Sequence, residues 1–186
     1  MYWRRGYCLK IFLIIIFVRP HKNDERIIHR YMETFKVFIE IPQSTVNNKY
    51  ELDHKTGKVV LDFVFENLVW PFNYGEVIGT LGGDGDALDA LVFSTEPLEQ
   101  SDVVDCIPFG IVKMLDRGEV DDKLMFVPAD DPISAKYKDI EDFSEPEKNQ
   151  IKNLYAEIAR QKKKVVEIKD FLGKSQALEE LNNSLV

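Results

Sequence analysis

The stretch FKVFIEIP (residues 35–42) alternates apolar and polar side chains, which is the period of a β-strand with one buried face. KYELD (49–53) repeats the alternation, and KVVLDFVF (58–65) is rich in β-branched and aromatic residues. Between them, HKTG (54–57) has the composition of a turn. These segments predict three short strands, of which the last two form a hairpin.

Three further strand-like segments follow at the spacing expected of a barrel or sandwich. They are ALDALVF (87–93), VVDCIPFGIVKML (103–115) and DKLMFVP (122–128), with RGEVD (117–121) as the loop between the last two. The pattern changes after Pro132. The sequence therefore predicts a fold in which strands come first and helices come last.

A helix is predicted over EPEKNQIKNLYAEIARQKKK (145–164), where apolar residues recur at helical spacing. Those residues are Ile151, Leu154, Tyr155 and Ile158. KKVVEIKDF (163–171) predicts another strand, and SQALEELNNSL (175–185) predicts a second helix with Ser175 as its N-cap. The fold class expected from this order is α+β, mainly β.

The charge is divided unevenly along the 186 residues. The chain carries a formal charge of -8, but residues 1–31 hold seven Lys/Arg and two Asp/Glu, or +5, which leaves -13 for residues 32–186. Nucleic-acid affinity depends on clustered Lys and Arg, so an acidic body argues against a nucleic-acid binder of the OB type. Cys8 and Cys106 form no CxxC motif, which excludes a disulfide framework and favours a reducing, cytoplasmic setting.

The N-terminus imitates a signal peptide, because a basic segment precedes the apolar run IFLIIIFV (11–18). The run is too short to span a bilayer, and no small-residue cleavage site follows it. It is an extension that is dispensable or never translated, a weak anchor or targeting segment, or ordinary core. We expect residues 1–31 to be an extension and residues 32–186 to be the folded domain, with no membrane partner for that domain.

LGGDGDALDALVF (81–93) concentrates Asp84, Asp86 and Asp89 beside three glycines. Two carboxylates about 4 to 5 Å apart repel each other by roughly 3 to 4 kcal/mol at an effective dielectric constant near 20, and a divalent cation relieves that repulsion best. A solvated Asp/Gly turn is the alternative. An EF-hand is excluded, because Asp89 stands where that loop needs glycine and Thr95 where it needs glutamate.

A second acidic set, Asp116, Asp121 and Asp122, is followed directly by Lys123. Ligand sets made only of oxygen atoms suit Mg²⁺ or Mn²⁺ better than zinc. Glu40 and Glu51 lie on predicted strands, where a glutamate facing the interior needs a partner. Cations beside ammonium groups describe a site for a small polyphosphate.

Other catalytic schemes find little support in the sequence. His21, His29 and His54 have no paired Ser or Cys nucleophile, and no GxxxxGK phosphate-binding loop occurs.

Five segments in consistent order resemble the soluble family I inorganic pyrophosphatases. They are IEIP, KYELD, WPFNYG, GDGDALD and MLDRGEVDDK. The resemblance implies a five-stranded OB-like closed β-barrel flanked by helices. It also implies hydrolysis of inorganic pyrophosphate to two phosphates with several Mg²⁺ per active site, in a protein that forms homo-oligomers.

The resemblance assigns metal ligands and reacting groups. Asp84, Asp89 and Asp121 would hold one activating metal, and Asp89 would also reach a second. Asp116 would join Asp121 on a metal that arrives with substrate, and Glu40 would support a further metal through water. Asp86 would be the general base for the attacking water.

The same resemblance assigns the substrate-binding groups. Lys49, Lys123 and Tyr74 would hold phosphate oxygens, and Glu51 would organise the charges around them.

The sequence departs from the family pattern at three places that bind substrate phosphate. Asp62 or Phe63 stands where the family has an arginine, Trp70 replaces a tyrosine, and Ile158 and Ala159 replace a Tyr-Lys pair. The candidates to replace the lost contacts are Lys58, Arg117, Arg160 and Lys162. Two alternatives stay open: a phosphohydrolase retuned to another phosphoanhydride, and an inactive metal-binding homologue or acidic interaction module.

Overall fold

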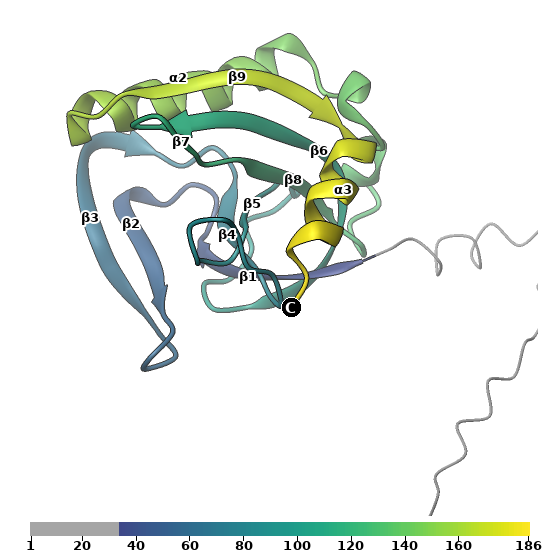
Figure 1. The fold of residues 1–186 in the computed structure, drawn as a ribbon, viewed down its shortest axis with the longest axis horizontal. Helices are drawn as coiled ribbons and strands as arrows, with labels where there is room; N and C mark the ends of the chain where they lie inside the picture. The colour runs from purple at the N-terminus through teal and green to yellow at the C-terminus, as the bar shows by residue number, and fades with distance from the viewer. Residues whose placement is uncertain (1–33) are drawn as a thin grey trace, which may run out of the picture. The chain divides into compact units, whose positions relative to one another are not determined.

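The computed structural model describes residues 34–186, which form a mainly β fold with two helices (Figure 1). The prediction of an extension over residues 1–31 lies outside this range. The strands are β1 (Phe35–Ile41), β2 (Val46–Asp53), β3 (Lys58–Val69), β4 (Asn73–Val77), β5 (Asp89–Val92), β6 (Val103–Asp116), β7 (Glu119–Val120), β8 (Lys123–Pro128) and β9 (Val166–Gly173). The helices are α2 (Glu145–Lys162) and α3 (Lys174–Ser184), with short 3-10 turns η2 (Ser134–Lys136) and η3 (Ile140–Asp142).

The strands form a seven-stranded sheet and a separate two-stranded hairpin. In the large sheet, β1 pairs with β4, β4 with β5, β5 with β8 and β8 with β6, and β6 also pairs with β1 and β9. Only the pair of β5 with β8 is parallel among the pairings of residues 34–186. The hairpin consists of β2 and β3, and Figure 1 shows it beside the sheet with the end of α2 near β3.

The core lies between the sheet and α3. Buried residues from β1, β4, β5, β6 and β8 form its centre, and Ala177 and Leu181 of α3 pack against them. α2 buries the four apolar residues predicted from its spacing, which are Ile151, Leu154, Tyr155 and Ile158. Its N-terminus carries a capping box in which Ser144 and Glu147 satisfy each other's backbone donors.

The strand-then-helix order and the hairpin turn at residues 54–57 are confirmed, one strand escapes prediction, and two predicted details are wrong. The strand that escapes prediction is β4, because NYGEV is buried at four of five positions and shows no alternation. β7 lies within the predicted loop. α3 begins at Lys174 rather than after a Ser175 cap, since Asp139 Oδ1 accepts the hydrogen bond of the Lys174 N–H at 3.0 Å.

Two β-bulges change the direction of side chains that matter below. In the pairing of β1 with β4, Ile39 is opposite Gly75 and Ile41 is opposite Tyr74, which leaves Glu40 as the extra residue. In the hairpin, Lys49 is opposite Phe63 and Tyr50 is opposite Leu61, which leaves Asp62 as the extra residue.

Neither helix within residues 34–186 is both long enough and apolar enough to cross a membrane.

Candidate active site

A cavity of about 240 Å³ brings together side chains from the hairpin, the 82–88 loop, the strands of the sheet and α2. Nine predicted site residues line it: Lys49, Glu51, Tyr74, Asp84, Asp86, Asp89, Asp116, Asp121 and Lys123. Trp70, Tyr155, Ile158, Lys162 and Lys164 complete its wall, together with Ala87. The tenth predicted residue, Glu40, lines an adjoining cavity of about 170 Å³ that shares Glu51, Tyr74, Asp86 and Asp89 with the first.

The parallel pairing of β5 with β8 places Asp89 directly opposite Lys123. The Lys123 ammonium contacts the Asp89 carboxylate and lies 2.6 Å from Asp121 Oδ1, although Lys123 is only 3% exposed. Burial works to lower the pKa of Lys123, but the charges of Asp89 and Asp121 outweigh it and raise that pKa above its ordinary value. Lys123 is therefore a buried cation held between two carboxylates.

Tyr74 supports the same carboxylate from β4. Its hydroxyl donates a hydrogen bond to Asp89 Oδ1 at 2.6 Å, and its ring lies against Trp70 with centroids 5.5 Å apart. Burial, with the nearby Asp89 charge, raises the pKa of Tyr74 well above its ordinary value. The Trp70 indole N–H donates instead to the carbonyl oxygen of Asn48 at 3.0 Å.

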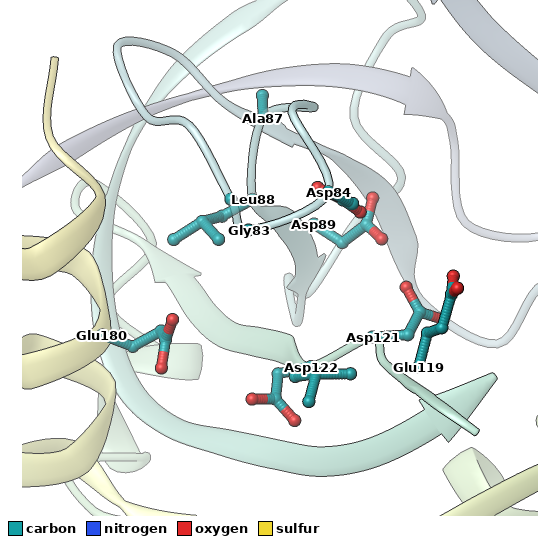
Figure 2. A pocket seen from close by; sticks show the side chains of 11 residues that line it. Gly83, Asp84, Ala87, Leu88, Asp89, Glu119, Asp121, Asp122 and Glu180 are labelled. Carbon is teal, nitrogen blue, oxygen red and sulfur yellow. The ribbon is translucent and has the colours of Figure 1, made fainter.

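Asp84 and Asp86 lie on the exposed loop before β5. Asp84 Oδ1 accepts the Asp86 N–H at 3.1 Å, and the Gly82 N–H donates to the Asp86 carbonyl at 2.7 Å. Gly85 lies between them with φ +94°, a conformation that favours glycine. Figure 2 shows Asp84, Asp89 and Asp121 around the edge of a neighbouring cavity of about 720 Å³.

Asp116 lies at the end of β6 and pairs with Lys164 at 2.6 Å through Oδ2. Its other carboxylate oxygen, Oδ1, is buried without a hydrogen-bond partner among residues 34–186. Asp122, the third member of this acidic set, contacts Lys113 and accepts the Met114 N–H at 3.0 Å. In Figure 2 the Asp122 carboxylate is turned away from Asp84, Asp89 and Asp121.

Glu40 is the most deeply buried acid of the region, with 5% exposure. The bulge turns its carboxylate toward the hairpin, where Oε1 accepts the Leu52 N–H at 2.6 Å. Burial raises the pKa of Glu40 to about 7, and the charges of Glu76 and Asp89 add to the increase. A cation near this carboxylate would be favourable. Glu76, which no sequence motif marks, lines the cavity of about 170 Å³ together with Glu40 and pairs with His54 at 3.0 Å.

No three Asp, Glu, His or Cys side chains within residues 34–186 lie close enough together to hold one ion. Instead, Asp89 and Asp121 both form ion pairs with the ammonium of Lys123, and Asp116 forms an ion pair with the ammonium of Lys164. The orphan oxygen of Asp116 and a donor set made of oxygen atoms nevertheless fit Mg²⁺ or Mn²⁺.

Of the candidates to replace the lost phosphate contacts, only Lys162 lines the cavity. Arg160 is exposed and pairs with Glu157 at 2.6 Å. The sequence does not reveal Lys164 and Asp62 as functional residues, because each depends on a contact between distant segments and not on a local motif. Lys164 pairs with Asp116 of β6, and Asp62 of β3 accepts from Lys162 of α2.

The cavity thus combines carboxylates, which suit divalent cations, with ammonium groups, which suit phosphate oxygens. The inorganic pyrophosphatase family profile matches residues 37–186. The chain belongs to the inorganic pyrophosphatase family.

Individual relatives agree with the profile. The chain is 39% identical over 153 residues to the inorganic pyrophosphatase of Streptomyces coelicolor, covering 81% of this chain and 93% of that protein. It is 39% identical over 148 residues to soluble inorganic pyrophosphatase 2 of Chlamydomonas reinhardtii, covering 79% and 77%. The solved inorganic pyrophosphatase of Helicobacter pylori superimposes with a TM-score of 0.77 at 35% identity, covering 82% of this chain and 92% of that one.

Proposed function

We propose that this chain hydrolyses inorganic pyrophosphate to two phosphates in a reaction that requires Mg²⁺, with Mn²⁺ as a possible substitute. The observation that carries the proposal is that nine of the side chains assigned from the family resemblance line one cavity, in a chain that matches the pyrophosphatase family over residues 37–186.

Asp84, Asp89, Asp116 and Asp121 would hold the metal ions, and Glu40 would support a further ion through water. Mg²⁺ bound there would neutralise the carboxylates and lower the pKa of a coordinated water. The unpartnered oxygen of Asp116 and the raised pKa of Glu40 are consistent with acids that gain from a nearby cation.

Asp86 is the general base of the proposed reaction. It is exposed at the cavity wall, and its side chain makes no ion pair within residues 34–186. In the chemical step, the oxygen of the attacking water forms a bond to one phosphorus, the bond from that phosphorus to the bridging oxygen breaks, and Asp86 accepts the proton of the water.

Lys49, Lys123 and Tyr74 hold phosphate oxygens, and Glu51 keeps Lys49 in place through their ion pair. In the structure the Lys123 ammonium contacts Asp89 and Asp121, and with a metal ion held by those carboxylates it would be available to bind phosphate oxygens. Tyr74, whose hydroxyl now donates to Asp89, must turn its O–H to reach the substrate.

We extend the proposal to the architecture and setting of the protein. The succession of pairings β1-β4-β5-β8-β6, with β6 returning to β1, supports a five-stranded OB-like closed barrel. Residues 32–186 would be the folded domain and residues 1–31 an extension to it. The protein would act in the cytoplasm as a homo-oligomer.

The test is phosphate release from pyrophosphate by the purified full-length chain, with Mg²⁺ and with excess chelator. We expect release that requires the metal. If Mg²⁺ raises the melting temperature and yet no phosphate is released, the protein is an inactive metal-binding homologue.

A second candidate substrate class is another phosphoanhydride. It is favoured by the absence of an arginine between Arg30 and Arg117, since Asp62 or Phe63 of β3 stands where the family resemblance implies an arginine that contacts phosphate. Comparing kcat/KM for pyrophosphate with that for tripolyphosphate and nucleoside triphosphates separates the two candidates.

A further inference from the structure

Two lysines that line the 240 Å³ cavity form ion pairs with the same carboxylate, that of Asp62. Lys49 Nζ, from β2, and Lys162 Nζ, from the last residue of α2, each lie 3.1 Å from Asp62 Oδ2. Both lysines line the cavity, whereas Asp62, on β3, is not part of its lining. The carboxylate therefore fixes two cations at the cavity wall.

The β-bulge explains why Asp62 can do this. In a regular strand, Asp62 and Phe63 would point to opposite faces, but Asp62 is the extra residue of β3 between the pairs at Leu61 and Phe63. Both residues contact the same ammonium: Lys162 Nζ lies 4.9 Å from the centroid of the Phe63 ring. A carboxylate and the face of an aromatic ring thus hold the Lys162 cation together.

The last turn of α2 is attached to β3 by a separate contact. Gln161 Nε2 donates to the Glu66 carbonyl at 2.8 Å, and Gln161 Oε1 accepts the Glu66 N–H at 2.7 Å. Because the side-chain amide satisfies both backbone groups of Glu66, the neighbouring Lys162 is held in a fixed direction.

Lys162 also differs in its charge environment from Lys123 and Lys164, which line the same cavity. Lys123 pairs with Asp89 and Asp121, and Lys164 pairs with Asp116, so their carboxylate partners are themselves proposed metal ligands. The one carboxylate that contacts Lys162 within residues 34–186 is Asp62, which it shares with Lys49. An ammonium has three donors, which leaves Lys162 with donors for an anion in the cavity.

We propose that Lys162 binds a phosphate group of the substrate, held in position by Asp62, Phe63 and Gln161. This inference rests on the proposed pyrophosphatase function and names a residue of its substrate pocket. The proposal also gives Asp62 a role: its carboxylate positions the ammonium of Lys162, which lies on α2, 100 residues away in the sequence.

The experiment compares Lys162→Gln with the wild-type full-length chain in Mg²⁺. Loss of a charged hydrogen bond to phosphate is expected to raise the KM for pyrophosphate by about 10- to 100-fold, with a smaller effect on kcat. Lys162→Arg, which keeps the positive charge, is expected to retain most of the affinity. A KM for Lys162→Gln within about twofold of wild type would overturn the proposal.

A binding measurement makes the result independent of turnover. Methylenediphosphonate, a pyrophosphate analogue that resists hydrolysis, should raise the melting temperature of the Mg²⁺-loaded wild-type chain, and Lys162→Gln should lose most of that increase. The increase caused by Mg²⁺ alone should stay the same in both chains. If the wild type binds the analogue but releases no phosphate, the proposed function fails while the role of Lys162 is still decided.

The matched control is Lys152→Gln. Lys152 lies on the same helix, but its ammonium is 5.5 Å from the Phe171 ring centroid and 4.0 Å from Glu145, and it does not line the cavity. The control should keep the wild-type KM and analogue binding. If both variants lost pyrophosphate affinity and analogue binding equally, the effect would come from the overall charge of α2, and the assignment to Lys162 would be overturned.

Discussion

At the scale of the residue, the exposed position of Asp86 makes its proposed role easy to separate from stability. Asp86→Asn removes the proton acceptor and keeps the size of the side chain, so kcat should fall by at least about 100-fold while the melting temperature stays nearly unchanged. Asp105→Asn, on an exposed ion pair with Lys36, is the control and should keep full activity. Steady-state kinetics and thermal unfolding check both; an active Asp86→Asn chain would contradict the assignment.

Lys123 offers a second prediction, because its ammonium is buried between two carboxylates. Lys123→Met leaves Asp89 and Asp121 facing each other without a cation, so in chelator the free energy of unfolding should decrease by about 3 to 5 kcal/mol. Mg²⁺ should restore more stability to this variant than it adds to the wild type.

Urea unfolding with and without Mg²⁺ measures both effects. Lys36→Met, which breaks an ion pair exposed by more than half on each side, should cost less than about 1 kcal/mol and show no extra recovery in Mg²⁺. Equal losses for the two variants would contradict the special position of Lys123.

At the scale of the element, the close approach of β1 to β4 depends on Gly75. A Cβ atom at that position would lie 1.8 Å from the carbonyl oxygen of Phe38, which belongs to the backbone and cannot rotate away. Gly75→Ala should therefore separate β1 from β4, displace the neighbouring Tyr74 and destabilise the protein by more than about 3 kcal/mol.

The matched control is Gly83→Ala, where an added Cβ meets nothing within 4 Å. Its melting temperature should stay close to that of the wild type. A Gly75→Ala chain that unfolds at the wild-type temperature would show that the strands can separate at little cost.

Asp131 ties two loops together. Its carboxylate accepts hydrogen bonds from the Thr95 N–H at 2.7 Å, the Thr95 hydroxyl at 3.0 Å, and the backbone N–H groups of Ile133 and Ser134. Burial opposes ionisation, but the hydrogen bonds from Ser134 and Thr95 outweigh it and hold the pKa of Asp131 well below its ordinary value of 3.8. Asp131→Asn should reduce stability by about 1.5 to 3 kcal/mol.

The sign of the pH dependence follows from that lowered pKa. The stabilisation is complete above the ordinary pKa and is lost as the pH falls toward the pKa of the folded state, so the folded wild type loses stability in acid. Urea unfolding at about pH 6 and about pH 2.5 should show a smaller decrease in Asp131→Asn than in the wild type. Asp130→Asn, at the exposed neighbouring position, should behave as the wild type.

How much the sequence predicts differs between the elements. Alternating segments such as 35–42 predict their strands correctly, because one face is buried and the other is solvated. β4 escapes prediction because it is flanked by β1 and β5 and buried on both faces. The bulges at Glu40 and Asp62 escape it too, since an extra residue in a ladder leaves no mark in the local pattern.

The carboxylates of the candidate site could be found because like charges concentrated in a short segment need an explanation. The contact of Lys162 with Asp62 could not, because it joins positions 100 residues apart and depends on the exact end of α2. Sequence reasoning thus finds the acids that repel each other, and it names Lys162 only as one of four candidate cations, without its partner Asp62.

At the scale of the whole molecule, we predict that residues 1–31 are not needed for folding. Within the described residues, the core side chains of β1, β4, β5, β6 and β8 pack with one another and with α3. A chain that begins at Met32 should match the full-length chain in melting temperature within about 4 °C, a difference of less than about 1 kcal/mol. Phosphate release should also be equal. A large loss of either would make the extension part of the folded domain.

The end of α2 has a consequence for synthesis on the ribosome. Lys162 and Lys164 enter the cavity from a segment that is translated after every acidic residue proposed for it. A nascent chain released before Lys162 is translated would contain all the proposed acidic site residues but would lack the positive charges of Lys162 and Lys164. Pyrophosphate turnover should thus begin only after α2 has emerged, so that incomplete translation products are silent rather than partly active.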